Sequence, residues 1–191
     1  MGSTRIDPCS KILKRQVIDR WCVEQCDPAH TVRYIGFTFE EAHRMVSMLA
    51  VMNRKGWHVE APLLNDTTLT RDYLFEECRR CFGFLPRLYA FGFSHQNCGG
   101  ACVKAGHREW ARLLRFIPEV YGWWEDNEQE FQQRVGTDAT ILRDRRGGTA
   151  AWLSLRAFRE RLQATWQAML PGMDPFDGLD DTLACAFCAA A

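Results

Sequence analysis

Apolar residues recur along this chain at helical and at strand-like spacings, and the two kinds of segment alternate. Apolar positions three and four residues apart are typical of amphipathic helices, and they predict helices over residues 10–21, 38–56, 70–81, 107–116, 118–131 and 154–169. Short runs rich in branched and aromatic residues predict strands over residues 31–37, 57–64, 88–93 and 139–143. The alternation favours an α/β fold, in which a small, mainly parallel sheet has many flanking helices.

Residues that stabilise helix ends support four of these boundaries. Thr70 and Ser154 precede predicted helices and can act as N-cap residues. Pro118 stands at the first position of a predicted helix, where proline is well tolerated. Thr38 and Glu41 have the three-residue separation of a capping box. We therefore expect helices to begin directly after Thr38, Thr70 and Ser154, and at Pro118.

The composition changes after the last predicted helix. Hydrophobic residues make up 47% of the 191 residues, which is enough to bury the core of one ordinary domain. Beyond Pro171 glycine, proline and aspartate become frequent, and such a segment favours irregular structure. We expect a single domain over residues 1–170 and an irregular, cysteine-containing tail over residues 171–191.

The charges of the chain balance, with 24 lysines and arginines against 24 aspartates and glutamates. A net charge of zero gives no general attraction for nucleic acids or membranes, so any site for an anion must be local. The helix over residues 118–131 carries a concentration of carboxylates, which we expect to form a solvated outer face. These carboxylates are Glu125, Asp126, Glu128 and Glu130.

Targeting signals and cysteine usage indicate a cytoplasmic protein. The sequence has no run of about 18 apolar residues that could span a membrane, and its first residues lack the apolar segment of a signal peptide. It contains nine cysteines, an odd number that does not fit a complete set of internal disulfides. In a reducing compartment these cysteines favour metal, cluster or catalytic use.

The loop predicted over residues 92–106 contains the chain's densest group of chemically active residues. It holds four glycines together with His95, Cys98, Cys102 and Lys104. Glycines allow backbone conformations in which several amides point at a thiolate or another anion. A histidine or lysine beside a cysteine favours the thiolate form. The loop therefore predicts a catalytic site in which Cys98 or Cys102 is a nucleophile assisted by His95 or Lys104.

The same two cysteines can instead ligate a metal. Together with two thiolates from Cys9, Cys185 and Cys188, they would hold an iron–sulfur cluster of the 4Fe–4S type. With Cys185 and Cys188 alone they would complete a tetrahedral zinc site. The remaining cysteine pairs lie in or beside predicted helices, where their spacing favours burial on one face. These pairs are Cys22 with Cys26 and Cys78 with Cys81.

Two cations, Lys14 and Arg15, lie early in the helix predicted over residues 10–21. They fit a solvated basic face, which is the usual role of a short charge run. They also fit an anion site that combines their charges with the free backbone amides at the helix N-terminus.

Several segments, taken in order, resemble the phosphoadenosine-phosphosulfate reductase family. They are CSKILKR (9–15), YIGFTFEEAHR (34–44), APLL (61–64), GFLPRLYAFGFSHQNCGGACVKAG (83–106) and ILRDRRGG (141–148), followed by a cysteine-containing end. The resemblance runs from about Cys9 to Cys188. It is strongest to the C-terminal half of the phage-type and prokaryotic reductase-like members.

This resemblance implies an adenine-nucleotide α-hydrolase-like fold with a parallel sheet. It also implies a role in sulfur metabolism, either sulfonucleotide reduction or sulfur transfer, with an adenine nucleotide or sulfonucleotide as ligand and an iron–sulfur cluster in some members. By the resemblance, Cys98, Cys102 and a C-terminal cysteine are candidates for the cluster or for a redox thiol. The cations that are candidates to face phosphate or sulfate are Lys14, Arg15, Arg143, Arg145 and Arg146.

One segment of that family does not occur in the sequence. The pyrophosphate-binding loop, an SGGKDS-like segment after the first strand, is missing. We therefore expect that this chain alone does not hydrolyse ATP, and that a protein partner or a second copy supplies the missing half of the nucleotide site. The alternative is a non-catalytic interaction or regulatory protein that keeps the scaffold, with a structural zinc site. Whether a nucleic acid is the sulfur acceptor is left open by the sequence.

Overall fold

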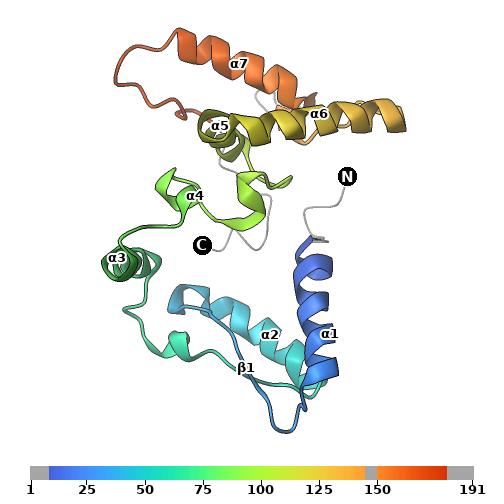
Figure 1. The fold of residues 1–191 in the computed structure, drawn as a ribbon, viewed down its shortest axis with the longest axis vertical. Coiled ribbons are helices and arrows are strands. Elements are labelled where there is room, and N and C mark those ends of the chain that lie inside the picture. Colours follow the sequence, from blue (N-terminus) through green and yellow to red (C-terminus); the bar gives the residue numbers. More distant parts are fainter. Residues whose placement is uncertain (1–8, 145–149, 180–191) are drawn as a thin grey trace. The chain divides into compact units, whose positions relative to one another are not determined.

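The computed structural model describes residues 9–144 and 150–179, which form two compact units (Figure 1). The boundary between the units lies between Leu85 and Pro86, and each unit has buried residues of its own. The described residues combine helices with two small sheets, so the chain is a mixed α/β protein. No described helix is both long and apolar enough to cross a membrane. The predicted single domain and the adenine-nucleotide α-hydrolase-like topology stay predictions.

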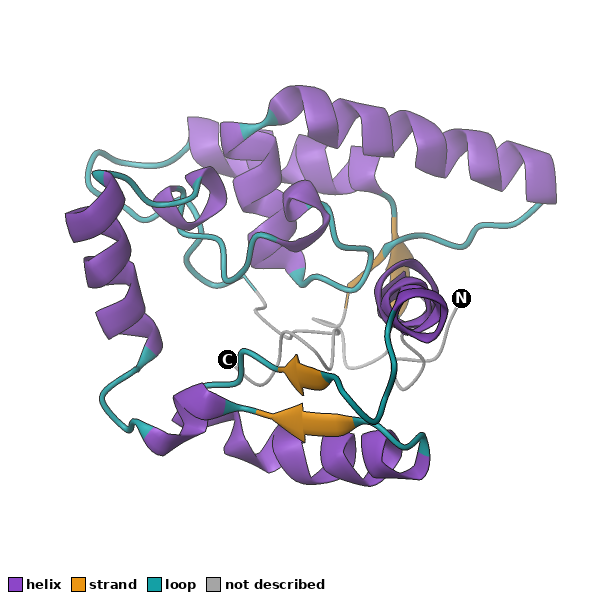
Figure 2. Ribbon diagram, turned by 60° about the horizontal axis from the view of Figure 1, so that its bottom comes forward, coloured by secondary structure: helices purple, strands orange, loops and turns teal. Residues whose placement is uncertain are grey.

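The described part of the first unit contains three α-helices and one pair of strands. Its elements are α1 (Gln16–Gln25), β1 (Val32–Tyr34), α2 (Ala42–Arg54), β2 (His58–Glu60) and α3 (Arg71–Phe82). A π-helical segment, Ser10–Arg15, runs directly into α1, and short 3-10 turns occupy Phe39–Glu41 and Pro62–Asn65. Strands β1 and β2 pair in parallel, with Val32 opposite His58, and Figure 2 shows them side by side next to α2. This parallel pair agrees with the type of pairing that the sequence predicts.

A small network holds α1 against this strand pair. The guanidinium of Arg33 on β1 lies 3.0 Å from a carboxylate oxygen of Asp19 on α1. The same carboxylate binds the ammonium of Lys55 at 2.6 Å, just after α2. The Arg33 guanidinium also lies 4.6 Å from the centre of the Trp57 ring, which is buried. The network therefore connects α1, β1 and the end of α2 with the buried Trp57 ring.

The predicted helix caps of the first unit have different outcomes. The side chain of Thr70 accepts a hydrogen bond from the backbone amide of Tyr73, so that N-cap is confirmed. The capping box at Thr38 is wrong, because the Thr38 side chain makes no cap hydrogen bond. A 3-10 turn separates Thr38 from α2 and places Glu41 at the N-cap position, where Glu41 pairs with Arg44.

Over residues 86–144 and 150–179, the second unit begins with a short helix and contains three longer ones. Its elements are α4 (Arg87–Ala90), α5 (His107–Phe116), α6 (Pro118–Val135), β3 (Leu142–Asp144), β4 (Ala151–Leu153) and α7 (Leu155–Gln167). Strands β3 and β4 are antiparallel, so within the described residues the predicted single, mainly parallel sheet is not seen. The side chain of Ser154 caps α7 by accepting a hydrogen bond from the amide of Ala157, and Pro118 begins α6, as predicted.

The strand predicted over residues 88–93 is wrong. This segment begins with the single helical turn α4, which follows Pro86, and then turns at Gly92 (φ +80°). The amide of Phe93 donates to the carbonyl of Leu88 at 3.0 Å, which closes the turn. Local hydrogen bonds therefore satisfy backbone groups that a strand would have left for a neighbour.

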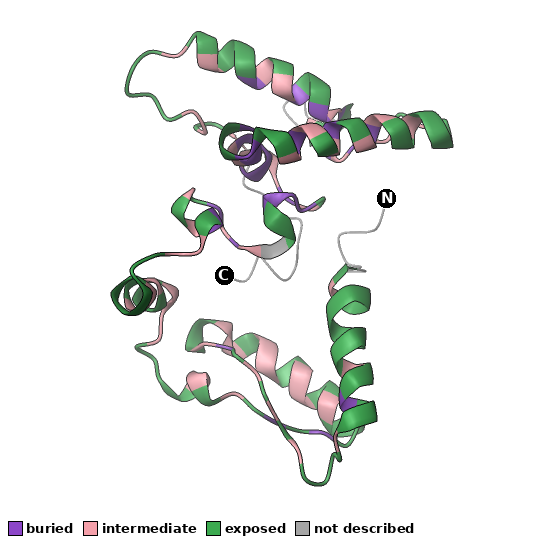
Figure 3. Cartoon of the chain, viewed as in Figure 1, coloured by how far each residue is buried: buried purple, intermediate pink, exposed green. Residues whose placement is uncertain are grey.

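The core of the second unit is centred on α5. Trp110, Ala111 and Leu113 on this helix are fully buried, and Figure 3 shows α5 as the most buried helix in the unit. Tyr121 of α6 packs its ring edge against Trp110, and its hydroxyl donates to the carbonyl of Leu155 at 2.7 Å. The aromatic side chains therefore connect α5 with both α6 and the start of α7.

The expected solvated acidic face of the helix over 118–131 is wrong for two of its four carboxylates. Glu125 and Glu128 are buried, whereas Asp126 and Glu130 are exposed. The physical reason is the helical spacing: Glu125 lies four residues after Tyr121 and Glu128 seven residues after it, which places both carboxylates on the core side of α6. The charged side chains alone predict exposure to solvent, but their position on the helix buries them.

Each buried carboxylate of α6 has protein partners. Glu128 accepts hydrogen bonds from the backbone amides of Ile141 and Leu155, both at 2.7 Å. Glu125 accepts from the guanidinium of Arg159 at 2.8 and 3.0 Å. Burial raises the pKa of Glu128, whereas the Arg159 guanidinium holds the pKa of Glu125 below its usual value. These two residues therefore fasten α6 to the β3–β4 hairpin and to α7.

The described part of the predicted tail, residues 171–179, contains no helix or strand, as expected. It nevertheless packs against the second unit. The indole nitrogen of Trp166 donates to the carbonyl of Pro175 at 2.9 Å, and the Phe176 ring lies 6.1 Å from that of Phe116.

Candidate thiol site in the loop before α5

The loop over residues 92–106 is fixed to the core by its apolar residues. Phe93, Ala101, Cys102 and Ala105 are buried members of the core cluster of the second unit. Between these fixed points, Cys98 is exposed. The loop is therefore anchored in the core on both sides of Cys98 and presents this thiol to solvent.

Cys98 has an unusual backbone conformation. Its φ of +56° makes it the only non-glycine with positive φ among the described residues. The following Gly99 is also left-handed, with φ +59°, and the amide of Ala101 donates to the carbonyl of Cys98 at 3.0 Å. A left-handed conformation costs a non-glycine residue about 1–2 kcal/mol. Such strain is concentrated at functional sites, where the surrounding structure holds it in place.

Gly100 explains how the loop is held. It is buried and left-handed, with φ +87°. A Cβ atom at this position would lie 2.9 Å from Cε1 of Phe93 and 3.3 Å from Cδ1 of Leu113. Only glycine fits here without a shift of the core, so the turn that carries Cys98 is placed directly against α5.

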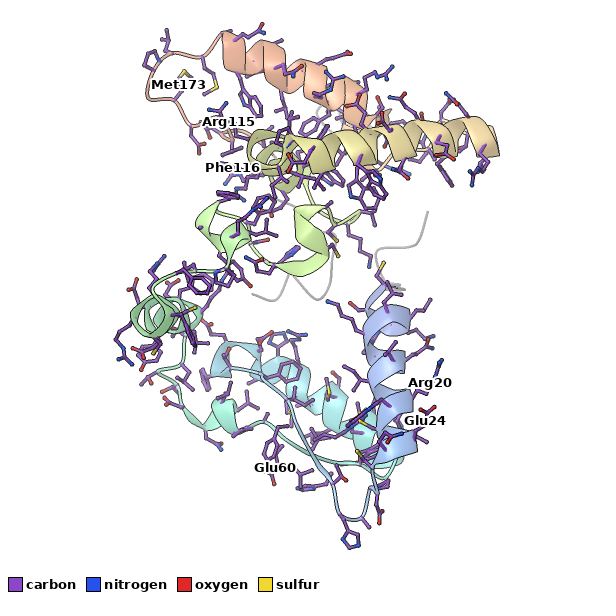
Figure 4. All side chains as sticks on the ribbon, in the orientation of Figure 1. Arg20, Glu24, Glu60, Arg115, Phe116 and Met173 are labelled. Atoms are coloured by element: carbon purple, nitrogen blue, oxygen red, sulfur yellow. The ribbon has the colours of Figure 1, made fainter. Side chains whose placement is uncertain are left out.

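The beginning of the loop is attached to α5 through an aromatic stack. The Phe116 ring, labelled in Figure 4 next to Arg115, lies 4.7 Å from the Phe91 ring, and the two planes are nearly parallel at 8°. From the middle of α5, the Arg112 guanidinium lies 2.6 Å from the buried carboxylate of Glu109, and its Nε would lie 3.6 Å from a Cβ atom added at Gly92. The Glu109–Arg112 pair was missed at the sequence level, although its three-residue separation on a predicted helix was the available signal.

The other predicted catalytic residues of the loop are more enclosed than Cys98. Cys102 and His95 are buried. Of the two cysteines in the loop, Cys98 is therefore the more accessible nucleophile. The ammonium of Lys104 is also buried, and no described residue forms a hydrogen bond with it. An enclosed ammonium is unfavourable unless an anion or acceptor lies beside it. The loop therefore combines an exposed thiol with a buried cation that is suited to an anionic ligand.

The predicted anion-binding cations are distributed over the chain. Lys14 and Arg15 are exposed on the π-helical segment of the first unit. Arg143 is exposed on β3, and its guanidinium carbon lies 3.8 Å from the centre of the Trp152 ring. Arg145 and Arg146 lie outside the described residues. A joint role of these five cations stays a prediction.

The predicted metal ligands are only partly described. Cys98 and Cys102 share the loop, Cys9 is exposed in the first unit, and Cys185 and Cys188 lie outside the described residues. Within the described part of the chain, all seven cysteines are free thiols, and no three His, Cys, Asp or Glu side chains are grouped to hold a metal. The iron–sulfur and zinc sites therefore stay predictions.

The remaining cysteine pairs partly follow the predicted burial. Cys22 is buried and Cys26 and Cys78 are half-buried, whereas Cys81 is exposed.

Comparison with family models, curated proteins and solved structures gives no match for this chain.

Proposed function

We propose that the protein is an enzyme of sulfur metabolism in which Cys98 is the attacking thiol, as the resemblance to phosphoadenosine-phosphosulfate reductases suggests. One observation carries this proposal. Cys98 is an exposed cysteine in a strained, left-handed conformation, on a loop whose neighbouring residues are buried in the core. A turn of this kind would be less strained with glycine at position 98, so cysteine at this position has a conformational cost that a purely structural turn would avoid.

The proposed substrate is an adenylyl sulfate, and the chemistry is a displacement at sulfur. The Cys98 thiolate attacks the sulfonate sulfur, a bond forms between the two sulfur atoms, and the bond from sulfur to the phosphate oxygen breaks. The electron pair of the broken bond leaves with the nucleotide phosphate. A small external thiol then attacks Cys98, releases sulfite and leaves a mixed disulfide. A second external thiol attacks that disulfide and restores the Cys98 thiolate, so two thiols are oxidised for each sulfite released.

The surrounding residues support this assignment of roles. The buried ammonium of Lys104 is suited to an anionic group such as the sulfonate. Cys102 is buried in the core cluster, which favours an external thiol over Cys102 in the second step. An iron–sulfur cluster, if bound, would supply redox or electrostatic assistance near the thiols. No step above depends on it.

Replacement of Cys98 by serine is expected to abolish sulfite release from adenylyl sulfate or its 3′-phosphorylated form, since serine is a far weaker nucleophile than a thiolate. The assay measures sulfite after anaerobic purification, in the presence of a small thiol. Cys81→Ser is the matched control, because Cys81 is another exposed thiol, on α3, outside the proposed site. The control is expected to keep the wild-type rate.

Sulfite release that is unchanged in Cys98→Ser would reject Cys98 as the nucleophile. A wild-type protein without any such activity would favour a second candidate, a non-catalytic interaction protein. That candidate is supported by exposed apolar residues along the N-terminal helical segment of the first unit, at Leu13, Val17 and Trp21. Spaced four residues apart, they form an apolar stripe of the kind that partner proteins cover.

A further inference from the structure

A small pocket lies beside the thiol loop, entirely within the second unit. Its volume is about 310 Å³, which is suited to a small metabolite. The pocket is lined by residues of α4, of the loop and of the start of α6. Gly99, the residue directly after Cys98, forms part of the lining. A ligand in this pocket is therefore held next to the turn that carries the exposed thiol.

Two opposite charges line this pocket. Arg87 comes from α4 and Glu119 from the first turn of α6, and both side chains are exposed. Among the described residues neither forms an ion pair, although the Arg87 guanidinium lies 5.7 Å from the centre of the Phe91 ring. Opposite charges that share a pocket without neutralising each other are complementary to a ligand that carries both charges.

The rest of the lining adds one polar group and an apolar surface. The side-chain nitrogen of Gln96 is buried, and no described residue accepts a hydrogen bond from it. A buried donor without an acceptor is unfavourable, so the amide is suited to a ligand oxygen. Leu88, Ile117 and Val120 supply the apolar part of the lining. This part is suited to a short side chain of low polarity.

We propose that this pocket binds a free α-amino acid with a short sulfur-containing side chain. The carboxylate would face Arg87 and the Gln96 amide, and the ammonium would face Glu119. That the ligand carries both a positive and a negative charge is inferred from the pocket alone, since Arg87 and Glu119 both line it. The choice of a sulfur-containing side chain rests on the proposed function, because an aminothiol bound beside Gly99 is placed to be the external thiol that attacks Cys98.

The test uses S-methyl-L-cysteine, which cannot react with Cys98, and isothermal titration calorimetry on the full chain. Two analogues each lack one charge, namely 3-(methylthio)propionate without the ammonium and 2-(methylthio)ethylamine without the carboxylate. We expect Glu119→Gln to weaken binding of S-methyl-L-cysteine about tenfold or more, the usual effect of losing a hydrogen bond to a charged group. The same variant should leave binding of the propionate unchanged. Arg87→Gln should weaken the propionate and leave the amine unchanged.

Glu130→Gln and Arg79→Gln are the matched controls, because both side chains are exposed and lie outside the pocket. Both are expected to bind S-methyl-L-cysteine as the wild type does. Absence of saturable binding to the wild type, or an equal loss for all three ligands in the pocket variants, would overturn the proposal. Cys98→Ser should retain binding, so loss of catalysis and loss of the pocket are distinguished by separate measurements.

Discussion

Gly100→Ala is expected to lower the free energy of unfolding by about 2–4 kcal/mol, because two penalties act together. The residue has a φ of +87°, which an L side chain adopts only with strain. Its new Cβ would also lie 2.9 Å from the Phe93 ring, inside the buried core. Urea denaturation followed by circular dichroism measures the loss. Cys98 reactivity should fall in parallel, because the same glycine positions the loop.

Gly99→Ala separates the two penalties. Gly99 is also left-handed, but an added Cβ meets no atom within 4 Å. We expect a loss of only about 1 kcal/mol from backbone strain in this control. Equal losses for the two glycine variants would contradict the close packing of Gly100 on Phe93 and Leu113.

Glu128→Ala is expected to cost about 2–5 kcal/mol of unfolding free energy. The substitution removes the acceptor of two backbone amides, those of Ile141 and Leu155, and each buried donor left without a partner costs about 1–3 kcal/mol. Glutamine at the same position keeps one acceptor oxygen and should lie between alanine and the wild type. Thermal or urea denaturation of the three proteins measures this order.

Glu130→Ala is the matched control for Glu128→Ala, since Glu130 lies two residues further along α6 and is exposed. Its ion pair with Arg134 is a surface pair of the i,i+4 type, which contributes less than about 1 kcal/mol. A loss at Glu128 as small as the loss at Glu130 would mean that the β3–β4 hairpin is not fastened through that carboxylate.

The elements that could be predicted from the sequence are those fixed by local interactions. Helix α5 has the predicted bounds, because its apolar stripe is uninterrupted and lies between Gly106, the N-cap residue, and Pro118, which begins the next helix. The N-caps at Thr70 and Ser154 depend only on the next three residues, and both are confirmed. The strand predicted over residues 88–93 is wrong because its apolar composition does not distinguish a strand from a turn. The turn is formed by Gly92 and by the hydrogen bond from the Phe93 amide to the Leu88 carbonyl.

The site was only partly predictable. The glycines around Cys98 identified the loop, but the positive φ of Cys98 and the burial of Cys102 depend on packing against α5. The pocket could not have been found from spacing, because Arg87 and Glu119 are far apart in the sequence and are brought together by the fold. The burial of Glu125 and Glu128 could have been predicted, because both lie on the same face of the helix as Tyr121. Their charged side chains instead favoured the prediction of a solvated face.

The central claim is that Cys98 attacks the sulfur of a sulfonated nucleotide, and its covalent product tests this most directly. The measurement is peptide mass spectrometry of the full chain after anaerobic incubation with adenylyl sulfate and its 3′-phosphorylated form, without external thiol. The account predicts a sulfonate group on Cys98, also in a Cys102→Ser variant, and none on the exposed thiols of Cys9 and Cys81. A sulfonate on another cysteine, or no adduct with either nucleotide, would contradict it.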